Sequence, residues 1–260
     1  MNEYKILYID LETSFNIGTF WRPGSRISLS HSNILEERQI ILASYAWNDK
    51  KPKTVKWKKD PKSSNRYLKY CDKSVVESLV AEMDKADLIV GQNGDRFDIP
   101  WLRGRAMKHG VPMDHSYQSF DTLKKSRHYM NLNSNRLDYL GEFYLSGGKV
   151  ETGGFQLWLD CMFGCPKAMQ KMQTYCEGDI DLLREYYKHL IKYVPSNNHV
   201  GAALGFSKDA TCPTCGTHDI KMRKQYTTKV GNIRNNMQCA HGHPFTISHN
   251  QYLKWIKGDR

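Results

Sequence analysis

The sequence predicts an α/β domain with a mixed sheet flanked by helices, followed by a small module that contains cysteine. Three strand-like segments come first, and helical and strand-like segments then alternate, as in α/β domains with a partly parallel sheet. A stretch of small polar residues follows, and then three of the seven cysteines in two short clusters. We therefore expect an α/β domain over 1–195, a linker over 196–210 and the cysteine module over 211–260.

Each element is predicted from the spacing of its apolar residues. Strands are expected where short apolar runs rich in β-branched or aromatic residues lie between polar segments. These runs are 4–10, 38–47, 53–59, 87–91 and 119–124. Helices are expected where apolar residues recur every three or four positions, and these stretches are 73–86, 98–110, 137–145 and 166–194. Gly110 and Pro195 mark the ends of two of these helices.

The chain is basic, with 38 Lys and Arg against 27 Asp and Glu and a net charge of +11. Over half of this excess lies in 196–260, which has nine Lys or Arg and three Asp. A charge of this sign and size attracts polyanions such as nucleic acids. A solubilising surface charge is the alternative interpretation.

The sequence also limits where the protein is expected to act. It has no apolar run long enough to span a bilayer, and acids occur where a signal peptide would have its apolar stretch. We therefore expect a cytoplasmic protein with no membrane partner. In a reducing compartment the seven cysteines are expected to be metal ligands or free thiols.

Asp10 and Glu12 lie two positions apart at the end of the first apolar strand. Side chains at i and i+2 of a strand point to one face, whereas Leu11 between them points to the other. Neighbouring carboxylates repel each other unless a cation joins them, and Mg²⁺ or Mn²⁺ prefers such oxygen ligands. Two solvated acids at a surface turn are the alternative.

The segment 91–102 (GQNGDRFDIPWL) places a polar loop between a predicted strand and a predicted helix. Ligand-binding side chains commonly follow the carboxyl ends of such strands, so Asp98 is a candidate ligand, although it also suits a helix N-cap. Asn93 is a candidate to orient a ligand, and Phe97 to stack on a base. Asp95 is a rival carboxylate that spacing alone does not exclude.

The segment 175–179 (YCEGD) places Tyr175 and Asp179 one turn apart on the long predicted helix. Residues at i and i+4 share a helix face, so a phenol lies beside a carboxylate. An ordinary amphipathic helix with an exposed acid is the alternative.

Taken in order, these segments resemble the three motifs of the DnaQ-like, or DEDD, 3′→5′ exonucleases. YIDLET (8–13) resembles the first motif. GQNGDRFDIPWL resembles the second, in the form found in the proofreading domains of B-family DNA polymerases, where an Asn precedes a Phe-Asp pair and a Pro follows. YCEGDIDLL (175–183) resembles the third motif in its tyrosine form. The resemblance covers residues 4–194.

The resemblance implies an RNase H-like fold and hydrolysis of 3′-terminal nucleotides. It implies that two Mg²⁺ or Mn²⁺ ions are held by four carboxylates and that Tyr175 aligns the attacking water. The implied ligands are Asp10, Glu12, Asp98 and Asp179. No polymerase domain follows these motifs, so we expect a free-standing enzyme or one that serves a polymerase or another replication protein in trans.

The cysteine module has the spacing of a metal site. Cys212 and Cys215 form a CPTCG knuckle, and Cys239 follows in CAHGH. Three Cys and one His satisfy a tetrahedral Zn²⁺, and the arrangement resembles a zinc ribbon. The fourth ligand is His243 or His241; we favour His243, because one intervening residue leaves little room for both side chains to reach one ion.

Five cations of this module are candidate contacts for phosphates: Lys221, Arg223, Lys224, Lys229 and Arg234. The module has too little apolar content to fold without metal, so its Zn²⁺ is expected to be structural. A solvated basic face is the alternative interpretation of these residues.

The predicted function is a 3′→5′ exonuclease that hydrolyses terminal phosphodiester bonds of DNA with a free 3′ end by a two-metal-ion mechanism. Single strands are preferred, because the end must reach the ions unpaired. Such an enzyme suits DNA replication or repair. One alternative is an exoribonuclease that trims RNA 3′ ends, since the same carboxylates serve either sugar. Another is a non-catalytic, zinc-containing nucleic-acid-binding protein.

Overall fold

The computed structural model describes residues 4–22, 29–62, 67–114, 117–145, 147, 153–196, 198–206 and 211–257. Its centre is a five-stranded mixed sheet with the strand order β5-β4-β1-β8-β9. These strands are β1 (Ile6–Thr13), β4 (Ile40–Trp47), β5 (Lys53–Lys56), β8 (Leu88–Gly91) and β9 (Ser119–Asp121). Strand β4 alone runs against the other four. The predicted mixed α/β architecture is therefore confirmed.

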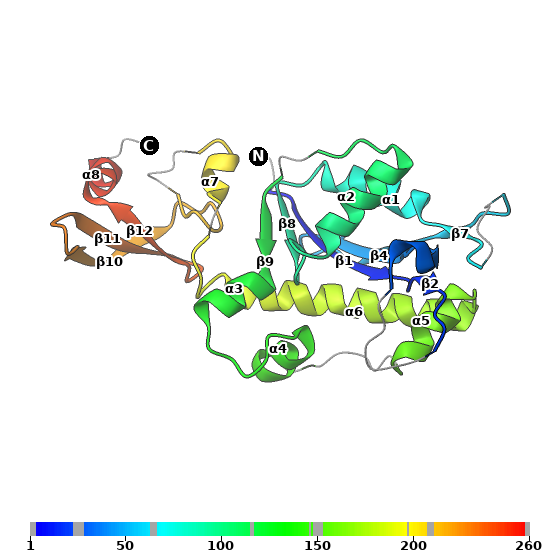
Figure 1. Ribbon diagram of the computed structural model, residues 1–260. Helices are drawn as coiled ribbons and strands as arrows, with labels where there is room; N and C mark the ends of the chain where they lie inside the picture. The colour runs from blue at the N-terminus through cyan, green and yellow to red at the C-terminus, as the bar shows by residue number, and fades with distance from the viewer. Residues whose placement is uncertain are drawn as a thin grey trace.

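Helices cover both faces of this sheet (Figure 1). One face carries α1 (Lys73–Met83) and α2 (Asp98–His109). The other carries α6 (Pro166–Leu190), against which pack α3 (Thr122–Tyr129), α4 (Leu137–Tyr144) and α5 (Phe155–Met162). Two short hairpins complete this part of the chain, β2 (Ile17–Gly18) with β3 (Ile34–Glu36) and β6 (Lys58–Lys59) with β7 (Tyr70–Cys71).

The alternation of side chains along β1 decides which of its residues meet α6. Leu7, Ile9 and Leu11 belong to the buried core that includes α1, α2 and the first half of α6. Tyr8 belongs to the core formed with α6, and its ring lies 5.7 Å from that of Tyr187. Because strand side chains alternate, the even-numbered acids of β1 lie on the face that α6 covers.

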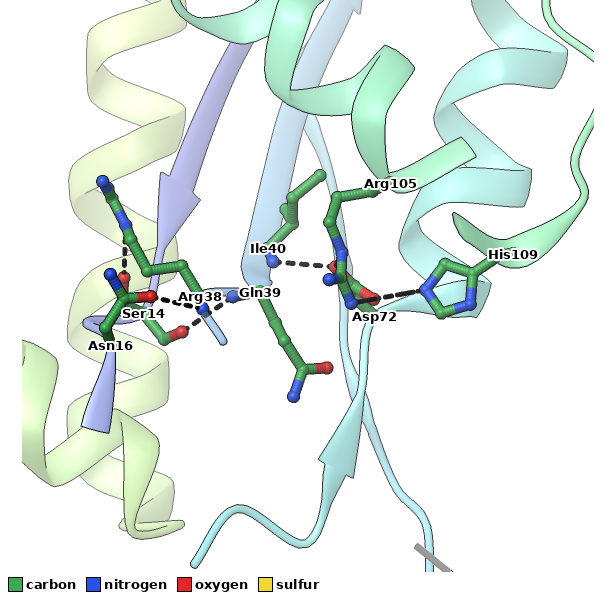
Figure 2. A network of polar contacts seen from close by, with 8 residues as sticks. All are labelled: Ser14, Asn16, Arg38, Gln39, Ile40, Asp72, Arg105 and His109. Carbon is green, nitrogen blue, oxygen red and sulfur yellow. Dashed lines mark hydrogen bonds and ion pairs between the residues drawn. The ribbon is translucent and has the colours of Figure 1, made fainter. Parts of the chain in front are cut away.

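A buried ion pair fixes α1 and α2 against β4 (Figure 2). Asp72, immediately before α1, accepts hydrogen bonds from Nε of Arg105 (2.6 Å) and from the backbone N–H of Ile40 (3.0 Å). Its second oxygen accepts from Nη2 of Arg105 (2.7 Å) and lies 2.7 Å from Nε2 of His109. Four groups therefore surround a carboxylate that has no exposed side-chain surface.

The C-terminal part of the chain has a core of its own and lies beyond the end of α6 (Figure 1). It comprises the antiparallel strands β10 (Ile220–Thr227), β11 (Ile233–Cys239) and β12 (Pro244–Ser248), packed against α8 (His249–Lys257). The short helix α7 (Val200–Ala203) lies within the predicted linker 196–210, of which 197 and 207–210 lie outside the described residues.

Several predicted bounds need correction. The predicted strand 119–124 ends at Asp121, because the Asp121 carboxylate accepts the backbone N–H of Lys124 (3.0 Å) and caps α3. The predicted strand 53–59 is divided at Trp57, which is buried and donates its backbone N–H to Ile41 (2.9 Å). In the described residues we find no helix that is both long and apolar enough to cross a bilayer.

Candidate active site and metal centres

The two acids of β1 each receive a hydrogen bond from a helix on the same side of the sheet. The thiol of Cys176 on α6 donates to Oδ2 of Asp10 (3.1 Å). The indole Nε1 of Trp158 on α5 donates to Oε2 of Glu12 (3.2 Å). Burial raises the pKa of Cys176, and the charges of Asp10 and Glu12 raise it further, so the thiol stays protonated and remains a donor.

Asp98 approaches the same two acids from the segment that follows β8, the strand next to β1. At the start of α2, it accepts the backbone N–H of Leu11 through Oδ1 (2.9 Å), between Asp10 and Glu12. Only 2% of Asp98 is exposed. Burial raises its pKa well above the usual range, and the nearby charge of Asp10 raises it further, whereas the hydrogen bond from Leu11 opposes the shift.

The loop that leads to Asp98 is closed by two glycines. A Cβ on Gly91 would lie 3.0 Å from Cα of Gly94, and a Cβ on Gly94 would lie 3.2 Å from Cα of Gly91. Asn93 between them has a φ of 66°, in the left-handed region that Asn tolerates. This tight turn carries the chain from the end of β8 to the carboxylate of Asp98.

Helix α6 brings Tyr175 and Asp179 to the same place as Asp10. These three residues line one cavity of about 500 Å³. Asp179 is buried and Tyr175 is half-buried. Glu12 and Asp98 are not among the lining residues, but the Trp158 ring that holds Glu12 lies 6.3 Å from that of Tyr175. The structure thus brings together acids from three distant segments of the sequence.

Three other acids near these segments, Asp95, Asp121 and Asp181, have different partners. Asp95 accepts from the Ser119 hydroxyl (2.7 Å), and Asp121 accepts the backbone N–H groups of Asn93 (3.1 Å) and Asp95 (3.2 Å). Asp181 is exposed and pairs with Arg184. These contacts hold loops and helices together.

The carboxylate set suits divalent cations in its chemistry. Carboxylate oxygens are the ligands that Mg²⁺ and Mn²⁺ prefer. A negative charge on Asp98 is unfavourable because of burial and of Asp10, and a bound cation would offset both effects. The four acids are not among the groups of described residues whose ligand atoms all lie within 4.8 Å of one another. Cations would therefore draw the carboxylates closer or bind only some of them directly.

Two groups of described residues have ligand atoms that all lie within 4.8 Å of one another, and one of these groups is the predicted zinc site. Its members are Cys212, Cys215, Cys239 and His243. The hydrogen bond between the Cys212 and Cys215 thiols lowers the pKa of Cys212 and raises that of Cys215, so without a metal ion Cys212 is the member of the pair that carries the negative charge. Three sulfurs and one imidazole, gathered mostly out of solvent, form a donor set suited to Zn²⁺.

His243 and His241 occupy different positions at this cluster. Nδ1 of His243 lies 3.4 Å from Sγ of Cys239, and His243 is 6% exposed. Nδ1 of His241 lies 3.3 Å from Sγ of Cys215, but His241 is exposed and not part of the group. The geometry therefore favours His243 as the fourth ligand.

The second group, Cys71, Asp72 and His109, is a weaker candidate for a cation. The guanidinium of Arg105 already occupies both oxygens of Asp72. A metal ion would have to displace that paired positive charge.

The predicted nucleic-acid contacts lie in two separate regions. Asn93 lines a cavity of about 510 Å³ beside α3, and Phe97 is half-buried at the start of α2, with its ring 6.4 Å from that of Trp101. The five cations of the C-terminal module are all exposed, on β10, on β11 and in the turn between them: Lys221, Arg223, Lys224, Lys229 and Arg234.

Further residues line the carboxylate cavity beside Asp10, Tyr175 and Asp179. They include Gln92, Arg127, Asn135 and Arg136. Gln92 stands inside the second motif, between the two glycines of its loop. No signal in the sequence joins Gln92 to the segment around Asn135.

Comparisons with known proteins support the fold. No family model matches this sequence, and no curated protein matches it either. The chain is similar in structure to a family B DNA polymerase from the hyperthermophilic archaeon Pyrobaculum calidifontis, with a TM-score of 0.51 and 16% sequence identity. The match covers 75% of this chain and 26% of the polymerase, so the chain spans about a quarter of that protein. At this identity the similarity is one of fold.

Proposed function

We propose that the protein is a metal-dependent 3′→5′ exonuclease that acts on DNA with a free 3′ end. The observation that carries the proposal is the shared cavity of Asp10, Tyr175 and Asp179, next to a buried Asp98 that is hydrogen-bonded to β1 between Asp10 and Glu12. Acids from three segments that resemble exonuclease motifs therefore lie near one another beside β1, the central strand of the sheet.

The fold gives independent support. A sheet of five strands in which only the second one from the edge runs against the others is the arrangement of RNase H-like domains, and the order β5-β4-β1-β8-β9 has this form. The structural similarity to part of a family B DNA polymerase points the same way. Such polymerases resemble this chain in the form of the second motif.

In the proposed reaction, water attacks the terminal phosphorus, the bond from phosphorus to the 3′-oxygen breaks, and a nucleoside 5′-monophosphate leaves. Two Mg²⁺ or Mn²⁺ ions would activate the water and neutralise the leaving oxygen. Asp10 and Asp179 would bind on the side of the water, and Asp10, Glu12 and Asp98 on the side of the leaving oxygen. Tyr175 would hold the water in line by a hydrogen bond.

The C-terminal module would add affinity for the strand. Cys212, Cys215, Cys239 and His243 would hold one structural Zn²⁺. Strand β10 is exposed along nearly its whole length and would present its cations to phosphates. Bound DNA would then contact both parts of the chain, and single strands would be preferred because an unpaired end can enter the carboxylate cavity.

The test is a time course on matched single-stranded DNA and RNA oligonucleotides labelled at the 5′ end, with zinc-loaded protein and Mg²⁺ or Mn²⁺. The proposal predicts a ladder of DNA products shortened from the 3′ end. Faster shortening of RNA would support an exoribonuclease instead. Binding of either strand with no shortening in both ions would support a non-catalytic nucleic-acid-binding protein.

A further inference from the structure

One wall of the carboxylate cavity is formed by α3 and by the segment just before α4, and this wall carries positive charge. Arg127, near the end of α3, and Arg136, immediately before α4, both line the cavity together with Asp10 and Asp179. Both arginines are exposed. Within the described ranges, neither guanidinium has an ion pair with an acid. The cavity thus has acids on one side and two available guanidinium groups on the other.

The positive charge continues past this cavity. Arg127 and Leu123 also line the neighbouring cavity of about 510 Å³. Arg96, Lys124 and His128 contribute to that second lining, which also includes the acids Asp95 and Asp121. Arg127 therefore lines both the carboxylate cavity and the neighbouring cavity.

Hydrogen bonds to the end of β8 hold this wall in place. Gln92 donates from Nε2 to the backbone oxygen of Asn135 (2.8 Å), and its Oε1 accepts from the hydroxyl of Thr122 at the start of α3. The hydroxyl of Ser134 accepts the backbone N–H of Arg136 (3.2 Å). One side chain of the second motif thus ties together the two segments that carry Arg127 and Arg136.

Asn135 also offers a group suited to a ligand. Its Oδ1 is buried and has no hydrogen-bond partner in the described part of the chain, although Asn135 lines the cavity. A buried acceptor without a partner is unfavourable, and a hydroxyl or amino group of a ligand would satisfy it.

We propose that this wall is the binding site for the terminal nucleotide, with Arg127 and Arg136 on its phosphate and Oδ1 of Asn135 accepting from its sugar or base. The inference rests on the proposed exonuclease function. Acids alone repel a phosphate, whereas arginine forks bind phosphate oxygens with two parallel hydrogen bonds. A cavity of about 500 Å³ suits one nucleotide, since pockets for small ligands have volumes of about 300–1,000 Å³. The released nucleoside 5′-monophosphate is therefore a ligand of the same wall.

The experiment compares Arg127→Gln, Arg136→Gln and the double variant with Arg103→Gln, a matched loss of one exposed arginine on α2, across the sheet. Binding of thymidine 5′-monophosphate is measured by ligand-detected NMR in Ca²⁺, an ion that also prefers oxygen ligands. The same nucleotide is used as an inhibitor of DNA shortening in Mg²⁺. Thymidine, which lacks the phosphate, is the control ligand.

We expect each arginine variant to weaken binding of the monophosphate about tenfold, as for a lost charged hydrogen bond, and the double variant to weaken it more. Thymidine binding should not change. For a single-stranded oligonucleotide, the slope of log binding constant against log salt concentration should become shallower by about 0.7 for each phosphate contact that is lost. Asn135→Ala should weaken monophosphate binding but leave that slope unchanged, because it removes no charge.

The inference is overturned if the double variant binds thymidine 5′-monophosphate as Arg103→Gln does. Failure of the exonuclease itself gives a different pattern. In that case the wild type releases no mononucleotide in Mg²⁺ or Mn²⁺, while arginine-dependent binding measured by NMR in Ca²⁺ would still support the wall as a nucleotide site.

Discussion

Oδ1 of Asp98 accepts the backbone N–H of Leu11 at 2.9 Å, and this hydrogen bond joins the first turn of α2 to the middle of the acidic segment of β1. Leu11 itself packs into the core on the opposite face from Asp10 and Glu12. The apolar residue between the two acids therefore anchors the third acid through its main chain.

Replacing Asp98 by Asn removes the negative charge but keeps a side-chain oxygen that can accept the hydrogen bond from Leu11. An amide oxygen can still accept the Leu11 N–H, so the fold should survive, and loss of a buried charge should leave the melting temperature of the metal-free protein equal or higher. Nuclease turnover should fall by about 10- to 100-fold, as expected when a group that supports a metal site is lost. Thermal unfolding and turnover in Mg²⁺ are measured together, with Asp181→Asn as the control for an exposed acid. Normal turnover in Asp98→Asn would remove Asp98 from the ligand set.

The thiol of Cys176 is expected to position Asp10. It donates to Oδ2 of Asp10 from a fully buried site, so Cys176→Ala should let the carboxylate rotate. Loss of a hydrogen bond of about 1 kcal/mol corresponds to a decrease of about fivefold in kcat, with KM for DNA unchanged. Cys176→Ser should restore kcat, because its hydroxyl is also a donor. Cys161→Ala removes a buried thiol elsewhere and serves as control; an equal loss of kcat there would indicate a general packing effect.

The Asp72–Arg105 ion pair should make stability depend on pH. Burial alone would raise the pKa of Asp72, but the hydrogen bonds from Arg105 and the Ile40 N–H outweigh it and lower the pKa. A carboxyl whose pKa is lower in the folded state stabilises the fold above its unfolded pKa of about 4 and loses that contribution as the pH falls through the folded value. Asp72→Asn should therefore cost about 3–5 kcal/mol at pH 7, because Arg105 would be left buried and unpaired, and less at pH 3. Urea unfolding at both pH values checks this, with the exposed Asp84→Asn as control; a loss independent of pH would contradict it.

The zinc module should distinguish its two histidines. His243→Ala should release the metal and unfold β10–β12, because a small module of this kind draws most of its stability from zinc. His241→Ala should retain one zinc per chain. Zinc content after gel filtration and the unfolding transition of the module are measured for both variants. Retained zinc in His243→Ala together with loss in His241→Ala would reverse the assignment.

The sequence predicts the candidate site best where residue spacing follows the period of a strand or a helix. The two-residue spacing of Asp10 and Glu12 and the one-turn spacing of Tyr175 and Asp179 each determine a common face. Because α6 packs on β1, the face of β1 with Asp10 lies next to the face of α6 with Tyr175 and Asp179. Sequence spacing could not show that the Leu11 N–H holds Asp98, because this contact spans 87 positions.

Other features leave no periodic pattern in the sequence. The segment before α4 contributes Asn135 and Arg136 through a hydrogen bond from Gln92, 43 positions away, and it has neither helical nor strand spacing. Strand β10 is exposed on both sides along residues 221–227, so its side chains show no alternation between apolar and polar. Helix α5, which contributes Trp158, follows a φ of 74° at Gly154 and has no polar capping residue to mark its start.

We propose that acids from three segments of the sequence jointly hold two divalent ions. This proposal is tested most directly by counting Mn²⁺ ions bound to zinc-loaded protein by electron paramagnetic resonance, in the wild type and in the Asp10→Asn/Asp179→Asn double variant. We expect two Mn²⁺ per wild-type chain and loss of both in the double variant, with the zinc content unchanged. Wild-type protein that binds no Mn²⁺, or a double variant that binds as much as the wild type, would contradict it.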